Sequence, residues 1–534
     1  MVECLKCEGV STVFGYPGVA IAPFYDCLLD SGVRHVLTRS EQGAGHAANG
    51  YARMTDRPGV CVATSGPGAT NLLTAIATAY SDSIPMVAIT GQVAVPQLGH
   101  DVFQEVDITG ASNSFTKYSY LVKSAQDIPR VFQEAFHIAS TGRKGPVLID
   151  MPVDVQKQMV AFSYPKEANI RGYKPRTDGH PMQIRKVTEA ISKSKRPLIC
   201  VGGGAFLSNS VEQIRAFCEK TNIPAVSTMM GVSVFPYNNP HYFGVVGQSG
   251  LKTANAAVHE TDLIILIGAR VGDRAITQPA HLEVNNTTIV HIDIDSAEIG
   301  KNLGATIPLV GNARQVLEQL MEQDILSEWG DWNTRLSALR ADEQQTLQAR
   351  ATEPGALDPH RFIRELCRAL PGGSVFVADV GRNQIWSHRN YCADGRFLTS
   401  GGMGTMGYSI PAALGASMAC PEKTVVAVCG DGSFQMSMNE LATIRQHGAC
   451  VKVIVMNNGI LGLVKELQDR VYNGRASGID LSGSPNIGGI AAAYDMPFFR
   501  ADSTEAAVAA VKQLLESPCS GILECIVSDK EASV

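Results

Sequence analysis

Short, uninterrupted runs of apolar residues recur along the chain, separated by longer segments of mixed polarity. A run of this kind predicts a β-strand that is buried on both faces, as in parallel sheets covered by helices. The runs lie at 59–63, 86–89, 146–150, 197–202, 262–267, 288–291, 424–428 and 451–456. The pattern therefore predicts an α/β protein built from doubly wound parallel sheets.

Two breaks in this alternation divide the chain into three predicted domains. A polar stretch with lysines and prolines at 157–181 reads as a linker, and a charged helical segment runs from Trp329 to about Ala351. We expect domains at 1–160, 180–335 and 355–534, each large enough to bury its own core.

The composition favours small-molecule chemistry. The 534 residues include 45% hydrophobic residues and 51 glycines, and the net charge is −6. This charge provides no basic surface for nucleic acid or an anionic membrane, and no apolar run approaches the ~20 residues of a membrane span. We expect neither partner and a cytoplasmic location, with an organelle matrix after removal of a transit peptide as the alternative.

The 13 cysteines favour a reducing compartment, because several of them, such as Cys61 and Cys525, lie in apolar runs and there act as small hydrophobic residues. Cys4 and Cys7 form the one Cys-x-x-Cys pair, a spacing that metal and redox sites use. No second pair follows at zinc spacing, so a short helix that ends before Gly9 is the favoured interpretation.

A candidate phosphate and metal site follows the apolar run 424–428. That run leads into Gly430-Asp431-Gly432-Ser433, and a helical pattern extends from about Met436 to His447. In a strand, tight turn and helix start of this kind, glycines let the backbone approach a phosphate and the Asp431 carboxylate can hold a divalent cation. Without context, a Gly-Asp-Gly segment is more often a plain turn.

The next predicted strand supplies that context. The run 451–456 leads directly to Asn457-Asn458. Because the carboxyl ends of parallel strands share one edge of a sheet, Asp431, the Asn458 amide oxygen and a carbonyl near Ile460 should meet there. Mg²⁺ prefers such oxygen ligands together with substrate phosphates. The arrangement resembles the metal-diphosphate site of thiamine diphosphate (ThDP) enzymes.

Motifs along nearly the whole chain resemble the large, catalytic subunit of acetolactate (acetohydroxyacid) synthase. They are Ser40-Glu41-Gln42-Gly43, Tyr51-Ala52-Arg53, residues 63–71 and 89–93, Phe103-Gln104-Glu105, Gly268-Ala269-Arg270, residues 291–295, Gly404-Thr405-Met406-Gly407 and Gly459-Ile460-Leu461-Gly462. The resemblance implies a carboligase that decarboxylates pyruvate on ThDP and transfers the hydroxyethyl unit to a second 2-ketoacid, giving 2-acetolactate. It also implies a pyrimidine-binding first domain, a central domain of the FAD or nucleotide-binding type, and a last domain that binds diphosphate and Mg²⁺.

The resemblance assigns catalytic roles to Glu41, Gln104 and Arg274, and it places Phe103 in the substrate pocket. Glu41 is expected to hydrogen-bond the aminopyrimidine of ThDP and to promote deprotonation of the thiazolium carbon, with a solvated loop glutamate as the alternative. Arg274 is expected to bind the carboxylate of the second ketoacid, with a surface ion pair as its alternative. Gln104 and Phe103 are expected to line the cofactor and the acceptor.

Further residues are expected to bind ThDP by the same resemblance. They are Val380, Gly404, Met406, Gly430, Gly432 and Ser433. Met406 would wedge the cofactor into a bent shape, although a methionine among glycines can also fill a core. The segment 402–407 also fits the dinucleotide pattern G-x-G-x-x-G, but 395–400 reads as a poor buried strand, which disfavours a nicotinamide dehydrogenase.

The central domain raises the question of FAD. In the family, a flavin without a net redox role binds here. The residues that resemble its contacts are Arg143 of the first domain and, in the central domain, Gly202, Gly203, Gly204, Thr228, Gly268, Arg270 and Asp293. Glycine-rich turns after strands bind phosphates, yet they also occur with nothing bound. FAD is therefore expected as a third cofactor beside ThDP and Mg²⁺.

Several positions depart from the family pattern. Leu467 stands where the family has a tryptophan in the acceptor pocket, and Gln248 in Gly247-Gln248-Ser249-Gly250 replaces the methionine of Gly-Met-His-Gly. Val19 replaces the last glycine of Pro-Gly-Gly, and Arg382-Asn383 replaces a Gln-His pair near the diphosphate. The resemblance leads us to expect a longer tail over the site than the residues up to Val534 provide. The changes at Leu467 and Gln248 alter the size and polarity of the expected substrate pocket, which leaves the acceptor open.

The resemblance also implies partners. The two ThDP-binding domains should meet across the subunit interface of a homodimer or homotetramer, so that Glu41 faces Asp431 of a neighbouring chain, and a small regulatory subunit is the further partner implied. A sister ThDP enzyme stays open: a 2-ketoacid decarboxylase, a flavin-linked oxidase or a carboligase with another acceptor would keep Glu41, Asp431 and Asn458. A catalytically inactive binding protein would be expected to lose these residues, and this chain keeps them.

Overall fold

The computed structural model of the chain describes residues 1–276, 280–325, 329–348 and 356–534. The predicted end of the charged helical segment near Ala351 and the predicted start of the last domain at 355 lie outside the described residues. Within the described ranges, no helix combines the length and the apolar composition that a membrane crossing requires.

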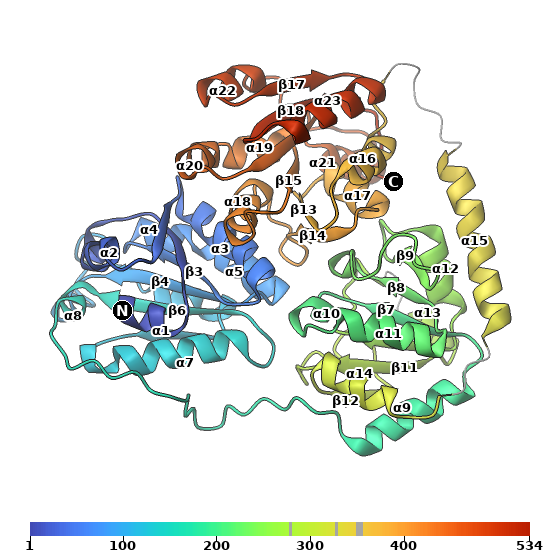
Figure 1. Cartoon of the computed structure of the whole chain (residues 1–534), viewed down its shortest axis with the longest axis horizontal. Coiled ribbons are helices and arrows are strands. Elements are labelled where there is room, and N and C mark those ends of the chain that lie inside the picture. The colour runs from blue at the N-terminus through green and yellow to red at the C-terminus, as the bar shows by residue number, and fades with distance from the viewer. Residues whose placement is uncertain (277–279, 326–328, 349–355) are drawn as a thin grey trace.

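Three six-stranded sheets form the framework, and all strand pairings within them are parallel. Figure 1 shows one sheet unit at the lower left, a second at the lower right and a third above both. The predicted class of three doubly wound α/β sheets is therefore confirmed. Between the first two units, residues 157–180 run without helix or strand, as the polar composition predicts.

The first sheet has the order β2-β1-β3-β4-β6-β5. Its strands are β1 (Thr12–Gly15), β2 (Arg34–Leu37), β3 (Gly59–Ala63), β4 (Met86–Gln92), β5 (Tyr118–Leu121) and β6 (Pro146–Pro152). Its helices are α1 (Val2–Cys7), α2 (Ala22–Leu29), α3 (Glu41–Thr55), α4 (Pro67–Asn71), α5 (Leu73–Asp82), α6 (Ile108–Ser112), α7 (Ile128–Ser140) and α8 (Val153–Gln156).

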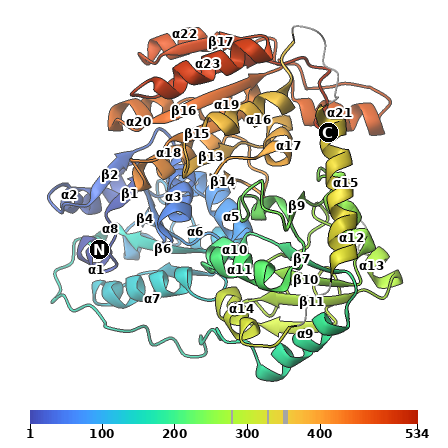
Figure 2. The same ribbon diagram turned by 45° about the vertical axis from the view of Figure 1, so that its right-hand side comes forward.

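The second sheet has the order β12-β11-β10-β7-β8-β9. Its strands are β7 (Pro197–Val201), β8 (Ala225–Ser227), β9 (Tyr242–Val245), β10 (Leu263–Ile267), β11 (Thr288–Asp293) and β12 (Ile307–Val310). Its helices are α9 (Pro181–Lys193), α10 (Gly204–Leu207), α11 (Val211–Thr221), α12 (Lys252–Glu260), α13 (Ala280–Val284) and α14 (Ala313–Met321), and α15 (Gly330–Gln348) follows them. In both views α15 runs along the outer side of this unit (Figures 1 and 2).

The third sheet has the order β14-β13-β15-β16-β18-β17. Its strands are β13 (Ser374–Ala378), β14 (Gly395–Thr399), β15 (Val425–Gly430), β16 (Val451–Asn457), β17 (Phe498–Ala501) and β18 (Gly521–Ile526). Its helices are α16 (Pro359–Ala369), α17 (Arg382–Asn390), α18 (Ser409–Ala419), α19 (Asp431–Ser437), α20 (Glu440–His447), α21 (Gly462–Val471), α22 (Ile487–Ala493) and α23 (Thr504–Glu516).

The first and third units pack on each other through α3 and α18, which lie side by side in both views (Figures 1 and 2). Two glycines make this contact close. A Cβ atom added to Gly50 would stand 2.0 Å from the carbonyl oxygen of Ala412, and one added to Gly415 would stand 1.8 Å from that of Ala47. Because any larger side chain would push the two helices apart, these glycines allow the first and third units to pack closely within one chain.

Two local predictions differ from the structure. The helical pattern expected from Met436 is two helices, and the first begins directly at Asp431, because Gly430 is extended and serves as its N-cap. The segment 395–400, read as a poor buried strand, does form strand β14 at the edge of the third sheet. An edge strand needs to bury only part of its length, and here Phe397, Leu398 and Thr399 are buried.

Candidate functional site

The carboxyl ends of β15 and β16 bring the predicted metal ligands together. Asp431 follows β15 and is only 3% exposed, and Asn458 follows β16. Burial raises the pKa of Asp431 to about 6, an effect that the backbone N–H groups of Asn458 and Gly459 oppose. The backbone near Ile460 is held by a short antiparallel bridge to Asp480. The two segments therefore face each other at one edge of the sheet.

Asp431 has the properties of a metal ligand. Its Oδ2 atom is buried and accepts no hydrogen bond. A buried carboxylate oxygen without a partner is costly, and a bound cation would relieve that cost. Among the described residues, no cluster of three or more His, Cys, Asp or Glu side chains could hold a metal. One carboxylate, one amide oxygen and one carbonyl beside a diphosphate form instead the sparse ligand set that suits Mg²⁺.

The turn that carries Met406 lies next to this edge. A Cβ atom added to Gly432 would stand 3.4 Å from the Met406 methyl carbon, so the methionine packs directly over the start of α19. Gly404 has a φ of +66° and only open space where a Cβ would be. Ser433 donates a 3.3 Å hydrogen bond to the carbonyl oxygen of Val380. The residues predicted to hold the ThDP diphosphate thus form one group.

A buried carboxylate that the sequence analysis missed holds this turn. Asp379 accepts hydrogen bonds from the backbone N–H groups of Gly407 at 3.0 Å and Ser409 at 2.7 Å. Burial raises the pKa of Asp379. Because the amides at the start of α18 are already bonded, the segment 402–407 does not offer them to a dinucleotide, although strand β14 does precede it.

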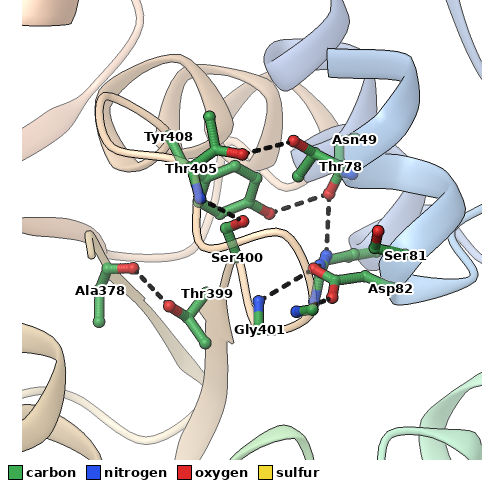
Figure 3. Close-up of polar contacts among 12 residues, drawn as sticks. Asn49, Thr78, Ser81, Asp82, Ala378, Thr399, Ser400, Gly401, Thr405 and Tyr408 are labelled. Carbon is green, nitrogen blue, oxygen red and sulfur yellow. Dashed lines mark hydrogen bonds and ion pairs between the residues drawn. The ribbon is translucent and has the colours of Figure 1, made fainter. Parts of the chain in front are cut away.

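The same turn is tied to the first unit of the same chain. Figure 3 shows Thr405 and Tyr408 reaching Thr78 and Asn49, and the Asp82 carboxylate beside Gly401. The Tyr408 hydroxyl donates to Asn49 at 2.9 Å, and Asp82 accepts the N–H group of Gly401 at 3.2 Å. Both ends of the turn are therefore fixed from outside its own sheet.

The carboxyl end of β3 gathers the second predicted group. Glu41 is the first residue of α3, and its Oε2 atom accepts a 3.0 Å hydrogen bond from the Asn71 amide. A Cβ atom added to Gly68 would stand 3.3 Å from Glu41 Oε1, and one added to Gly66 would stand 2.9 Å from the Cβ of Gln104. The structure therefore places Glu41 and Gln104 around one glycine-lined turn.

Glu440, which the sequence analysis also missed, anchors the start of α3. Its buried carboxylate accepts from the Arg39 N–H group at 3.1 Å and from the Ser40 hydroxyl at 3.1 Å. Ser40 in turn caps α3 by accepting from Gly43. The third unit thus positions the backbone beside Glu41 within the same chain.

The predicted acceptor residues are mostly exposed. Val19 is 84% and Phe103 is 87% exposed beside the Glu41 group, and Leu467 is 44% exposed on α21. Gln248 accepts a 3.1 Å hydrogen bond from the Arg274 guanidinium, so the residue that replaces an apolar methionine is bonded to the expected acceptor ligand. Exposed apolar side chains on both groups are typical of surfaces that another molecule covers.

Arg382, one of the departures from the family pattern, forms contacts that hold α21 in place. Its Nε atom donates at 2.7 Å to Glu466 on α21, and its Nη1 atom donates at 2.8 Å to the carbonyl oxygen of Asp529. The Glu466 carboxylate also accepts from the Ser533 backbone at 2.8 Å. Arg382 therefore joins α17, α21 and the C-terminal segment, and it supports the helix that carries Leu467.

A double-mutant cycle on Arg382 and Glu466 should reveal strong coupling. The Arg382 side chain is 5% exposed, so removing either partner leaves the other charge poorly solvated. We expect Arg382→Gln and Glu466→Gln to be non-additive by about 1–3 kcal/mol in the free energy of unfolding. The exposed pair Lys465 and Asp469 is the control and should couple by at most about 0.5 kcal/mol. Additive effects at Arg382 and Glu466 would show that the pair does not support α21.

The residues predicted to contact FAD line a single cavity of about 940 Å³ between the three units. Its walls include Arg143, Gly202, Gly203, Gly204, Thr228, Gly268, Arg270 and Asp293. The turns after β7 and β10 touch here, since a Cβ atom added to Gly202 would stand 2.2 Å from the carbonyl oxygen of Gly268. Burial raises the pKa of Asp293 to about 6. Arg143 is held by Glu298 at 2.7 Å.

This cavity has the features of a nucleotide site. Glycine turns at the carboxyl ends of β7 and β10 leave room for a phosphate, and an acidic residue at the end of β11 can bind a ribose. The volume lies in the range of sites for large organic ligands. Arg274 and Val380 also line the cavity, so it reaches the residues expected at the ThDP and acceptor sites.

The two groups of residues predicted to bind ThDP remain separate within one chain. No hydrogen bond or ion pair joins Glu41 to Asp431 among the described residues, and neither residue lines the central cavity. Each group instead lies at a sheet edge with exposed apolar side chains near it.

Three family models match consecutive parts of the chain. Residues 1–111 match the N-terminal TPP binding domain of thiamine pyrophosphate enzymes, residues 184–320 match their central domain, and residues 379–525 match their C-terminal TPP binding domain. Thiamine pyrophosphate is another name for ThDP.

Individual relatives are similar over most of their length. A probable acetolactate synthase large subunit of Methanocaldococcus jannaschii is 40% identical over 100% of this chain and 92% of its own. The acetolactate synthase isozyme 3 large subunit of Escherichia coli is 42% identical over 92% and 88%. The acetolactate synthase large subunit of Corynebacterium glutamicum is 43% identical over 90% and 78%. The chain therefore belongs to the acetolactate synthase large-subunit family of ThDP-dependent enzymes.

Proposed function

We propose that this chain is the catalytic subunit of an acetolactate synthase, which decarboxylates pyruvate and joins its two-carbon unit to a second 2-ketoacid. The observation that carries the proposal is the buried, unpartnered carboxylate oxygen of Asp431, which faces the segment of Asn458 at the sheet edge. A metal-bound diphosphate is the group that this edge fits. The first and third units would bind the pyrimidine and the diphosphate of ThDP, respectively.

The residues of the chain would bind the metal ion and the diphosphate, hold a proton at the pyrimidine ring and fix the shape of the cofactor. Asp431, Asn458 and the Ile460 carbonyl would hold Mg²⁺, and Gly430, Gly432 and Ser433 would contact the diphosphate. ThDP supplies, when bound, the carbon nucleophile and the electron sink for decarboxylation. Glu41 would hold a proton at the pyrimidine ring, and the packing of Met406 against Gly432 would fix the shape of the cofactor.

The separate positions of Glu41 and Asp431 favour a homodimer or homotetramer with active sites at the subunit interface. In such an assembly, the Glu41 group of one chain covers the Asp431 group of its neighbour. The exposed side chains of Val19, Phe103 and Leu467 would then be buried around the substrate. The names of the relatives call them large subunits, which supports a small subunit as a further partner.

We also propose that FAD binds in the cavity between the three units. Arg143, Arg270 and Asp293 would contact its polar groups, and the turns at Gly202, Gly203, Gly204 and Gly268 would contact its diphosphate. Thr228 lies in the same wall. A structural flavin would stabilise the junction of the units without taking part in net redox chemistry.

The proposal is tested by incubating the protein with ThDP, Mg²⁺ and pyruvate, with and without FAD, and identifying the product. Release of 2-acetolactate is expected, with a rate or thermal stability that depends on FAD. Acetaldehyde, acetyl phosphate or no turnover would instead assign the chain to another ThDP reaction.

Replacing Leu467 by tryptophan should change the choice of acceptor. Leucine leaves more space than an aromatic ring on α21, and the second changed position, Gln248, is polar and bonded to Arg274. We expect Leu467→Trp to change the ratio of kcat/KM for 2-ketobutyrate over pyruvate as acceptor by about 10-fold or more. Competition between the two acceptors measures it, with Val464→Trp on the same helix as control. An unchanged ratio would place Leu467 outside the acceptor pocket.

A further inference from the structure

A second cavity, of about 440 Å³, lies beside the proposed FAD cavity at the junction of the three units. The exposed residues of its lining include Asp56, Asn209, Glu212 and Arg314, and Arg53 and Arg396 are the more buried basic residues. The two cavities share a wall that includes Asp82, Gly203 and Met230. None of the residues assigned to ThDP, Mg²⁺ or the acceptor lines this second cavity.

Arg396 on β14 is the unusual group in this cavity. Its guanidinium carbon lies 3.2 Å from the centre of the Phe206 ring, and its Nη1 atom is buried without a hydrogen-bond partner. Among the described residues, no carboxylate lies within ion-pair distance of it. Burial and the nearby Arg53 lower the pKa of Arg396 to about 9, so the side chain still carries its charge at neutral pH.

Most of the neighbouring charges are already engaged, and the exposed Glu212 forms no ion pair with Arg396 in the described part of the chain. Arg53 donates to Asp82 at 2.7 Å and to Asn49 at 2.9 Å. Among the exposed residues, Asp56 pairs with Lys144 at 2.5 Å, and Arg314 pairs with Glu318 at 3.1 Å. The buried charge of Arg396 is therefore left without a counter-ion in the described part of the chain.

A buried and unpaired cation is costly, and an anion that enters the cavity would form a charge-assisted hydrogen bond with it. Apolar side chains form part of the lining beside Arg396 and include Met54, Ile84, Leu207, Met230 and Phe397. We propose that this cavity binds a small organic anion, whose carboxylate contacts Arg396 and whose apolar body packs against these side chains.

Such a ligand would act on the junction of the three units. Met230 packs against the turn that carries Met406, because a Cβ atom added to Gly401 would stand 2.1 Å from its sulfur. Asp82 lines the cavity and accepts the N–H groups of Gly401 and Gly402. Occupancy of the cavity therefore stabilises the contact between the first and third units that fixes this turn.

The test uses the full chain with saturating FAD, which occupies the neighbouring cavity, and two probes at constant ionic strength: 3-methylbutanoate and inorganic phosphate. We expect saturable binding of 3-methylbutanoate by calorimetry and a rise in Tm. Arg396→Met should weaken this binding by at least about tenfold, because the charge is lost while the length of the side chain is kept. Arg314→Gln, which removes an exposed cation, should bind as the original chain does.

Arg396→Lys keeps the charge and should retain part of the binding even if the methionine variant folds poorly. Equal binding of 3-methylbutanoate by the original chain and by a folded Arg396→Met variant would overturn the proposal. The proposal would also be wrong if Arg314→Gln lost this binding while Arg396→Met kept it. Saturable binding of phosphate but not of 3-methylbutanoate would overturn the proposed class of ligand. No saturable binding of either probe would show that Arg396 has only a structural role.

Discussion

Replacing Glu41 by glutamine should lower kcat by about 10²- to 10⁴-fold while ThDP and Mg²⁺ still bind. Glutamine keeps the size of the side chain, and its amide oxygen can still accept the bond that Asn71 donates to Glu41. The substitution removes only the ability to hold and release a proton at the pyrimidine ring. Single-turnover decarboxylation of pyruvate measures the loss, and calorimetric titration of ThDP verifies that binding is kept.

Glu440 provides a matched control for this substitution. Its carboxylate contacts the backbone of Arg39 and Ser40 next to Glu41 but is fully buried behind α3. Glu440→Gln should lower Tm, because an NH2 group replaces one carboxylate oxygen that accepts hydrogen bonds. This variant should reduce kcat less than Glu41→Gln does. Full activity of Glu41→Gln, or an equal loss in both variants, would show that Glu41 does not transfer the proton.

The central strands could be predicted because they are short, continuous apolar runs with glycines and polar residues at their ends, the pattern of strands buried on both faces. The shorter strands nearer the sheet edges gave no such run, and 395–400, which forms β14, was read as a poor buried strand. The first two residues of β14 are only partly buried, and one of them is Arg396, whose buried guanidinium contacts the ring of Phe206 in another unit. A pattern of neighbouring residues along the sequence carries no information about a contact between residues as far apart as Phe206 and Arg396.

The residues that support the site were also hidden from the sequence. Asp379 and Glu440 are single acidic residues with no motif around them. The partners of Glu440 are separated from it by 401 positions at Arg39, and those of Asp379 by 30 positions at Ser409. Arg382 was identified only as a departure from the family's Gln-His pair, and its ion pair with Glu466 on α21 could not be predicted from the sequence. Motifs identify groups that meet a ligand more readily than groups that hold the backbone in place.

Replacing Asp431 by asparagine should have opposite effects on two measurements. In the absence of Mg²⁺, burial opposes the charge of Asp431 and its Oδ2 atom has no partner, so a neutral side chain of the same shape should keep or raise Tm. With Mg²⁺, the anionic ligand is missing, and the affinity for ThDP should fall by at least about 100-fold, since even residues behind a metal ligand can cost 10- to 100-fold.

An unchanged or higher Tm without Mg²⁺, together with a weaker affinity for ThDP with Mg²⁺, is the result that distinguishes a metal ligand from a structural carboxylate. Thermal unfolding and ThDP titration, each with Mg²⁺ and with a chelator, supply both measurements on the same samples. Asp469→Asn on the exposed face of α21 is the control and should leave both unchanged. If Asp431→Asn lowers Tm in the absence of Mg²⁺ and still binds ThDP in a Mg²⁺-dependent way, the Asp431 carboxylate is not a metal ligand. Asn458 and the Ile460 carbonyl would then have to hold Mg²⁺ without an anionic side chain, which so hard a divalent cation disfavours.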